Sequence, residues 1–186
     1  MARGHSEPSR RAAGLLAAVV IWAFAVSLTC EAGRAASFAP KDLQVLGRAI
    51  AFMQPAPAPD ATIAIAYVAG NAASRQDADA IAALIGGGLQ AGRTTLRPKV
   101  VEVNSVGAGG FHVVIAAAGA NGPQLNTAAM TARALCVTTD IEAVRAGYCA
   151  MAITSEPRVE IIVNHAVSAA AGIEFAAAFR MMIREI

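Results

Sequence analysis

The hydrophobic positions of the chain follow two periodicities, one typical of helices and one typical of buried strands. In the segment 41–53, Leu43, Leu46 and Ile50 are spaced by three and four residues, so we predict a helix with one apolar face. The run 62–68 (TIAIAYV) is apolar on both faces, which predicts a strand inside a sheet that is covered on both sides. The prolines between these two elements separate them, because proline cannot continue a helix.

Helices and strands continue to alternate to the end of the chain. We expect further helices at 74–85, 123–133, 141–146, 165–171 and 175–186, and further strands at 99–106, 111–117, 135–139, 148–155 and 158–163. The last helix would carry on one face Phe175, Phe179, Met182, Ile183 and Ile186. Only Glu156 and Pro157 separate the final two strands, a spacing that predicts a hairpin. The expected fold is therefore α/β, a single-domain sandwich with a mixed, largely parallel sheet flanked by helices.

Residues 1–35 have the layout of a secretory signal, and residues 36–186 form the expected domain. Three arginines precede an unbroken apolar run at 12–28, and small residues follow it. Gly33 and Ala35 supply small side chains at the −3 and −1 positions of a cleavage site. An uncleaved N-terminal anchor is the alternative, since about 17 apolar residues is the lower limit for a membrane span. We expect export to the periplasm and cleavage near Ala35.

The positive net charge of the chain belongs to this signal. The chain has 15 Lys and Arg against 13 Asp and Glu, and residues 1–35 hold four of the Arg and two of the Glu, which leaves 11 of each sign. The remaining basic residues are scattered singly, whereas a nucleic-acid binder clusters them to neutralise phosphates. We therefore expect no nucleic-acid partner.

Removal of the signal also leaves two cysteines, Cys136 and Cys149, each in a predicted strand. An even number in an exported chain favours a disulfide. The short helix between the two strands can return the chain so that the cysteines lie side by side. Metal binding or thiol redox chemistry is the alternative, but metal sites usually combine close cysteines with further Cys or His ligands. Because the chain has no C-x-x-C, we predict a Cys136–Cys149 disulfide and no metal site.

The sequence shows no catalytic constellation. His112 lies in an apolar strand and His165 follows a capping residue, and neither accompanies a nucleophile motif such as G-x-S-x-G. Asp77 and Asp79 are two residues apart on a helix, so they point to different faces and suit the helix dipole. The glycines at 107–110 do not open a helix, so we interpret them as a turn and not as a phosphate-binding loop. We expect no enzymatic activity, no catalytic residue and no cofactor.

The best position for a binding pocket follows one of the predicted strands. Thr138, Thr139 and Asp140 come after the carboxyl end of the strand 135–139, where α/β sheets often bind ligands. Asp140 also fits the cap of the next helix, and Asn164 fits the cap of a later one. These four residues are the candidates for ligand or partner contact, with helix capping as the alternative role.

Four short segments near the end of the chain form a recognisable pattern. They are 135–140 (LCVTTD), Gly147, 158–164 (RVEIIVN) and 171–173 (AGI), followed by an apolar last segment. This pattern resembles that of the YfiR/HmsC family of periplasmic proteins. The resemblance implies a non-enzymatic regulator that binds the periplasmic sensor region of a membrane diguanylate cyclase and suppresses cyclic-di-GMP synthesis. It also implies that homodimer formation and the redox state of the cysteines are important.

A second interpretation is a periplasmic small-molecule-binding protein that serves a transporter or receptor. Export and the expected sheet suit this class equally. The mature chain of about 150 residues forms one domain, however, whereas the clefts of such proteins usually lie between two domains. The regulator is therefore the preferred expectation.

Overall fold

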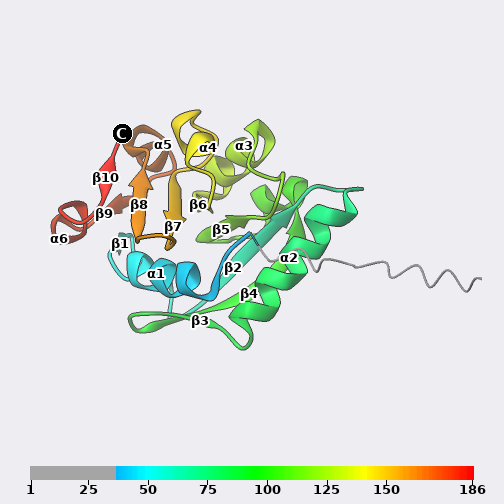
Figure 1. Ribbon diagram of the computed structural model, residues 1–186, viewed down its shortest axis with the longest axis horizontal. Helices are drawn as coiled ribbons and strands as arrows, with labels where there is room; N and C mark the ends of the chain where they lie inside the picture. The colour runs from blue at the N-terminus through cyan, green and yellow to red at the C-terminus, as the bar shows by residue number, and fades with distance from the viewer. Residues whose placement is uncertain (1–36) are drawn as a thin grey trace, which may run out of the picture. The chain divides into compact units, whose positions relative to one another are not determined.

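The computed structural model describes residues 37–186, which build an eight-stranded sheet with helices packed against it (Figure 1). The expected signal segment 1–35 lies outside the described residues. The helices are α1 (Pro40–Ile50), α2 (Ala72–Ile85), α3 (Pro123–Ala132), α4 (Ile141–Arg145), α5 (His165–Ala170), α6 (Ala177–Arg180) and the 3-10 helix η1 (Val103–Ala108). The strands are β1 (Met53–Gln54), β2 (Asp60–Tyr67), β3 (Leu89–Ala91), β4 (Thr94–Glu102), β5 (Val113–Ala116), β6 (Leu135–Thr138), β7 (Met151–Thr154), β8 (Glu160–Val163), β9 (Glu174–Phe175) and β10 (Arg184–Glu185).

The sheet is mixed and largely parallel, so the predicted fold class is confirmed. Its strand order is β10-β8-β7-β6-β5-β2-β4-β3. β2 pairs in parallel with β4 and β5, and β6 and β7 continue the parallel run on the β5 side. The antiparallel pairs of this sheet are β3–β4 and the predicted β7–β8 hairpin, and β10 lies parallel to β8. A separate small sheet joins β1 to β9.

The direction of winding changes between β2 and β5. From β2 the chain passes through α2 to β4 on one side, and it then crosses to β5 on the other side of β2. Helices α1 and α2 join the apolar cluster on one face of the sheet, whereas α3 and α4 join the cluster on the other face. This is the arrangement in which α/β sheets leave a crevice at the carboxyl ends of the two strands.

The central strand β2 shows how the two faces differ. Ile63 and Ile65 enter the cluster with α1 and α2, whereas Ala64 and Ala66 enter the cluster with α3. All four are fully buried, at 0% exposure. Alternate side chains of a strand point to opposite faces, so the doubly apolar run satisfies both layers at once. The strand predicted at 62–68 is therefore confirmed, with one or two residues of difference at its ends.

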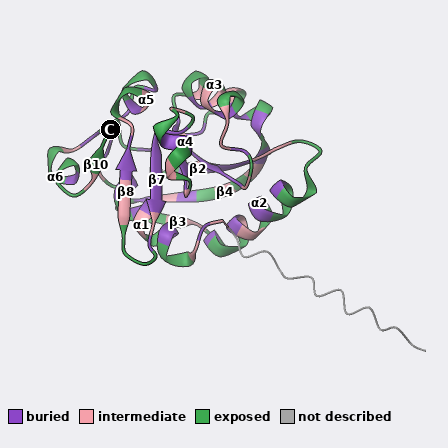
Figure 2. Ribbon diagram, turned by 45° about the horizontal axis from the view of Figure 1, so that its top comes forward, coloured by how far each residue is buried: buried purple, intermediate pink, exposed green. Residues whose placement is uncertain are grey.

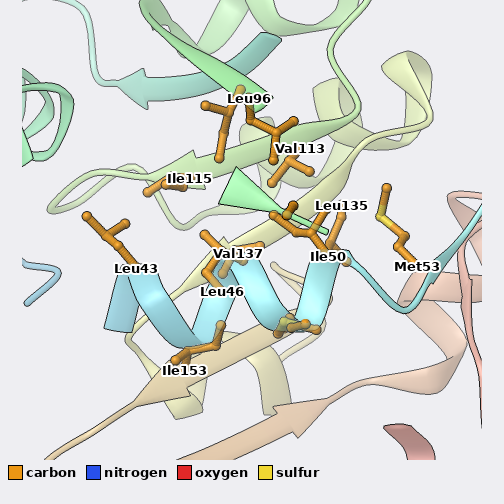
Figure 3. Packing of buried hydrophobic residues seen from close by; sticks show 14 of the residues in the cluster. Leu43, Leu46, Ile50, Met53, Leu96, Val113, Ile115, Leu135, Val137 and Ile153 are labelled. Atoms are coloured by element: carbon orange, nitrogen blue, oxygen red, sulfur yellow. The ribbon is translucent and has the colours of Figure 1, made fainter. Parts of the chain in front are cut away.

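Helix α1 packs on the face that carries the larger side chains. Figure 3 shows Leu46 and Ile50 of α1 among residues of the sheet that include Val137 and Ile153. Figure 2 shows the distribution of burial over the whole fold: the strands are mostly buried, and exposed residues lie on the outer surfaces of the helices. The helix predicted at 41–53 is confirmed as α1. It ends at Ile50, three residues earlier than predicted, because Met53 pairs with Phe175 in the small sheet.

The helix predicted at 175–186 is wrong. This segment contains the end of β9, the short helix α6 and the edge strand β10, which lie beside β8 at one end of the sheet (Figure 1). Its backbone pairs with distant residues, since Phe175 lies opposite Met53 and Arg184 opposite Ile162. These sheet hydrogen bonds outweigh the helical spacing of the apolar side chains, which is only a local preference.

Three smaller predictions also need correction. The strand expected at 99–106 starts at Thr94, because it pairs along the whole of β2, and residues 103–108 form η1. The strand expected at 148–155 begins only at Met151, so Cys149 precedes it. The helix expected at 74–85 starts at Ala72, because Asn71 caps it by accepting a hydrogen bond from the Ser74 amide at 3.1 Å.

Gly47 allows α1 to approach the β3 strand closely. A Cβ atom at this position would lie 2.3 Å from the backbone oxygen of Gln90, which is too close for any side chain. We expect Gly47→Ala to lower the free energy of unfolding by about 1–3 kcal/mol, the usual effect of overpacking. Gly87→Ala is the matched control, since a Cβ there meets no described atom within 4 Å. Urea unfolding of both variants tests this, and equal stabilities would show that the contact is unimportant.

Candidate functional site at the carboxyl edge of the sheet

A cavity lies where the winding direction changes. It has a volume of about 370 Å³ and lies between the loop after β2, with Val68 and Ala69, and the loop after β5, with Gly119. Asn104 of η1 and Gln124 of α3, which both carry amide groups, also line it. The cavity thus has apolar and neutral hydrogen-bonding groups, at the edge of the sheet where parallel α/β folds bind ligands. We call this edge, where β2, β4, β5, β6 and β7 end, the carboxyl edge.

A second, smaller cavity lies beside it at the ends of β5 and β6. Its volume is about 220 Å³, and Thr138, Thr139 and Asp140 line it together with Ser37 and Asn121. The structure therefore brings together three of the four residues that the sequence proposed for ligand or partner contact. Their contact with a ligand stays a prediction.

Asp140 uses its carboxylate within the fold. Oδ1 accepts hydrogen bonds from the amides of Glu142 at 2.9 Å and Ala143 at 3.3 Å, so the predicted capping of α4 is confirmed. Oδ2 accepts a hydrogen bond from the Asn121 amide group at 2.8 Å. The Asp140 amide in turn donates to Thr138 Oγ1 at 3.1 Å. This network fixes the wall of the smaller cavity by joining the loop after β5 to the loop after β6.

Asn164 lies away from the other three residues. It follows β8, which runs antiparallel to β7, so it lies at the opposite, amino edge of the parallel strands. Its Oδ1 accepts a hydrogen bond from the Val167 amide at 3.1 Å, and its Nδ2 donates to the Val144 oxygen at 3.0 Å. The predicted capping role is confirmed, and the capping residue also ties α5 to α4.

The role of Asp77 was not predicted from the sequence. This carboxylate is only 5% exposed, and it accepts hydrogen bonds from Ser37 N at 2.6 Å, Ser37 Oγ at 2.7 Å and Ala118 N at 2.7 Å. Ser74, one turn earlier in α2, is also buried and accepts a hydrogen bond from Val68 N at 3.1 Å. The first turns of α2 thus bind the backbone at the ends of both β2 and β5. The available signal was spacing, because Ser74 and Asp77 share the buried stripe of α2 with Ile81.

Asp79 differs from Asp77, as expected for residues on different faces. It is exposed and forms an ion pair of 3.0 Å with Arg75, whose guanidinium also lies 4.9 Å from the centre of the Tyr67 ring. The pKa of Arg75 is raised above its ordinary value, mainly by the hydrogen bond to Asp79 and to a smaller extent by the hydrogen bond to Tyr67. Arg75 therefore keeps its positive charge next to the end of β2.

Neither histidine joins these residues at the carboxyl edge. His112 precedes β5 at the amino edge, and its Nδ1 has no hydrogen-bond partner among residues 37–186. His165 is the first residue of α5. Within the described residues, no group of three His, Cys, Asp or Glu side chains is placed to hold a metal ion.

The predicted disulfide between Cys136 and Cys149 is present. Their Cα atoms are 4.9 Å apart, and both residues are buried. Cys136 lies in β6, and the Ala150 amide donates a hydrogen bond of 3.1 Å to its oxygen, which brings the two segments together. A disulfide is compatible with an oxidising compartment. No helix in the described range 37–186 is long and apolar enough to cross a membrane.

Replacement of Asp77 should loosen the carboxyl edge. In Asp77→Asn, one acceptor oxygen becomes a donor, so the amides of Ser37 or Ala118 lose a charged partner in a buried position. We expect the free energy of unfolding to fall by about 2 kcal/mol. Asp79→Asn, which removes only an exposed ion pair, should change it by less than about 0.5 kcal/mol. Chemical denaturation tests the difference, and an equal effect of both changes would contradict the assigned role.

Reduction of the disulfide should destabilise the domain. The bond closes a loop with a sequence separation of 13 residues. A disulfide that closes a loop of this size lowers the conformational entropy of the unfolded chain, which raises the free energy of unfolding by about 3 kcal/mol. Calorimetry with and without a reductant should show a lower Tm for the reduced protein. The Cys136→Ala/Cys149→Ala double variant is the control, because its Tm should not respond to the reductant. Two free thiols in unreduced protein from the cell envelope would contradict the bond.

The chain was compared with known protein families and with curated proteins. No family model matches it, and no curated protein matches it. The resemblance to the YfiR/HmsC family therefore rests on the segments at 135–140, 158–164 and 171–173, together with Gly147.

Proposed function

We propose that this protein is a non-catalytic regulator in the periplasm that restrains a membrane diguanylate cyclase by contacting the periplasmic sensor region of that enzyme. The resemblance supplies the partner class. The expected signal at 1–35 and the Cys136–Cys149 disulfide support an exported, oxidised protein. The proposal requires a surface that can bind another protein.

One exposed apolar surface carries this proposal. Large hydrophobic side chains are exposed just before β8 and in the residues that flank β10, and we call this set the edge patch. Its members are Val159 (49% exposed), Met181 (89%), Met182 (64%) and Ile186 (43%). Val159 and Met182 line one shallow groove of about 270 Å³. Exposed apolar patches of this kind mark protein interaction sites more often than isolated exposed residues do.

The chemistry of the edge patch suits a protein partner. Methionine side chains are flexible and polarisable, so they adapt to an irregular partner surface. Among residues 37–186, β10 is the last strand of the eight-stranded sheet and pairs only with β8. Its outer backbone groups can therefore accept a strand from another chain, which is a common way of binding an extended segment. The Arg184–Glu160 ion pair of 3.4 Å adds charged groups at the rim of the groove.

Disruption of the edge patch should release the cyclase. We expect Met181→Glu/Met182→Glu to raise cellular cyclic-di-GMP to the level of a gene deletion, because two charges would oppose burial against the partner. Leu84→Glu is the matched control, since Leu84 is 44% exposed on α2 and should leave the level unchanged. Cyclic-di-GMP is measured by mass spectrometry of cell extracts, and co-purification of a cyclase is measured in parallel. An unchanged level after deletion, with no cyclase co-purifying, would reject the proposal.

A homodimer is a second arrangement in which the edge patch is covered. Light scattering of the purified protein gives its mass directly. If the wild-type protein is a dimer and Met181→Glu/Met182→Glu is a monomer, the edge patch joins two copies. That result would reject the edge patch as the contact surface for the cyclase, which would then bind elsewhere on the dimer.

A second candidate function is small-molecule binding on behalf of a transporter or receptor. The observation that favours it is the cavity of about 370 Å³ where the winding direction changes between β2 and β5. Genomic neighbourhood separates the two functions, since a permease gene beside this one favours ligand binding and a membrane cyclase gene favours the regulator.

A further inference from the structure

A third cavity lies among the last secondary-structure elements, away from the carboxyl edge. Its volume is about 240 Å³, and residues of β8, α5, β9, α6 and β10 contribute to its wall. The buried residues Val163, Ser168 and Phe175 are part of this wall. The Ser168 hydroxyl donates a hydrogen bond of 3.1 Å to the His165 oxygen, which fixes the first turn of α5 at the cavity.

Groups of both charges surround this cavity. Its lining includes two acidic residues, Glu174 and Glu185, and the basic residue Arg180, together with His165, and all four are exposed to solvent. None of the ion pairs in residues 37–186 includes Glu174, Glu185 or Arg180. The carboxylates of Glu174 and Glu185 therefore lie more than 4.0 Å from the Arg180 nitrogens and from every other cationic side chain in this range. Opposite charges therefore line one cavity without bridging it.

We propose that this cavity binds a small zwitterion with a net positive charge, of the class of the basic amino acids. The guanidinium of Arg180 matches a carboxylate of the ligand, because its planar donors form paired hydrogen bonds with carboxylate oxygens. Glu174 and Glu185 match the two cationic groups of such a ligand. Val163 and Phe175 offer apolar surface to its methylene chain.

The charged residues around the cavity and its volume favour a basic amino acid over a diamine or a dicarboxylate. A diamine would satisfy both carboxylates but would leave Arg180 facing a like-charged ligand. A dicarboxylate would pair with Arg180 but would be repelled by Glu174 and Glu185. Drug-sized ligands occupy cavities of about 300–1,000 Å³. The value of about 240 Å³ therefore suits a molecule of amino-acid size.

Isothermal titration calorimetry of the purified, disulfide-bonded protein tests the proposal with three probes. They are L-lysine, cadaverine, which lacks the carboxylate, and glutarate, which lacks the cationic groups. We expect saturable binding of lysine and binding at least about tenfold weaker for the other two, a difference of about 1.4 kcal/mol. Arg180→Gln should weaken lysine binding about tenfold without weakening the binding of cadaverine. Glu174→Gln and Glu185→Gln should weaken the binding of both amines.

The exposed pair on α4 supplies the control, because Glu142 and Arg145 interact with each other outside this cavity. Arg145→Gln should leave lysine binding unchanged. Thermal melting without ligand checks that every variant is folded. The proposal is overturned if lysine gives no saturable heat up to about 10 mM, or if cadaverine or glutarate binds as tightly as lysine. It is also overturned if folded Arg180→Gln binds lysine normally. The titrations use the purified protein without a cyclase, and the variants leave Val159, Met181, Met182 and Ile186 unchanged, so the outcome does not depend on the proposed cyclase contact.

Discussion

β2 is hydrogen-bonded to a strand on each side and buried on both faces, so the other elements of the sheet take their places relative to it. Its parallel pairing with β4 extends from Asp60 to Tyr67, and its pairing with β5 covers Ile63 to Ala66. The isoleucines fill the layer with α1 and α2, and the alanines leave room for α3 on the other face. Burial of so much apolar surface in one strand provides a large part of the driving force for folding.

Double burial of β2 also determines where a cavity can form. Since α2 follows β2 on one face and α3 follows β5 on the other, the loops after the two strands separate at the carboxyl edge. Backbone amides exposed by this separation need acceptors. Ser74 and Asp77 supply them, by accepting hydrogen bonds from Val68 and Ala118. The same two side chains that complete the helix–sheet contact therefore hold the backbone of Val68 and Ala118, which line the two cavities at this edge.

The sequence predicted the features that depend on local chemistry. Asp140 and Asn164 are helix caps whose partners lie two or three residues away, and both were identified correctly. The apolar strand at 62–68 was also identified, because its pattern leaves no exposed face. The role of Asp77 was missed, since its partners Ser37 and Ala118 are 40 and 41 residues distant and no local rule connects them. The disulfide was predicted from cysteine number and expected export, although the strand boundary at Cys149 was not.

The segment 175–186 illustrates the same limit and explains how the edge patch arises. Its spacing placed Phe175, Phe179 and Met182 on one helical face, but the structure separates Met182 from the two phenylalanines. Phe179 is buried against Phe175 and Phe52, with ring centres 5.1 Å and 5.4 Å away, whereas Met182 is 64% exposed. The pairing of β10 with β8 requires an extended chain after α6, so Ile183 still packs against the core whereas Met182 and Ile186 do not. A local pattern that the fold overrides often marks a functional surface. Here the long-range pairing of β10 is the physical reason that apolar side chains remain exposed on this edge of the sheet.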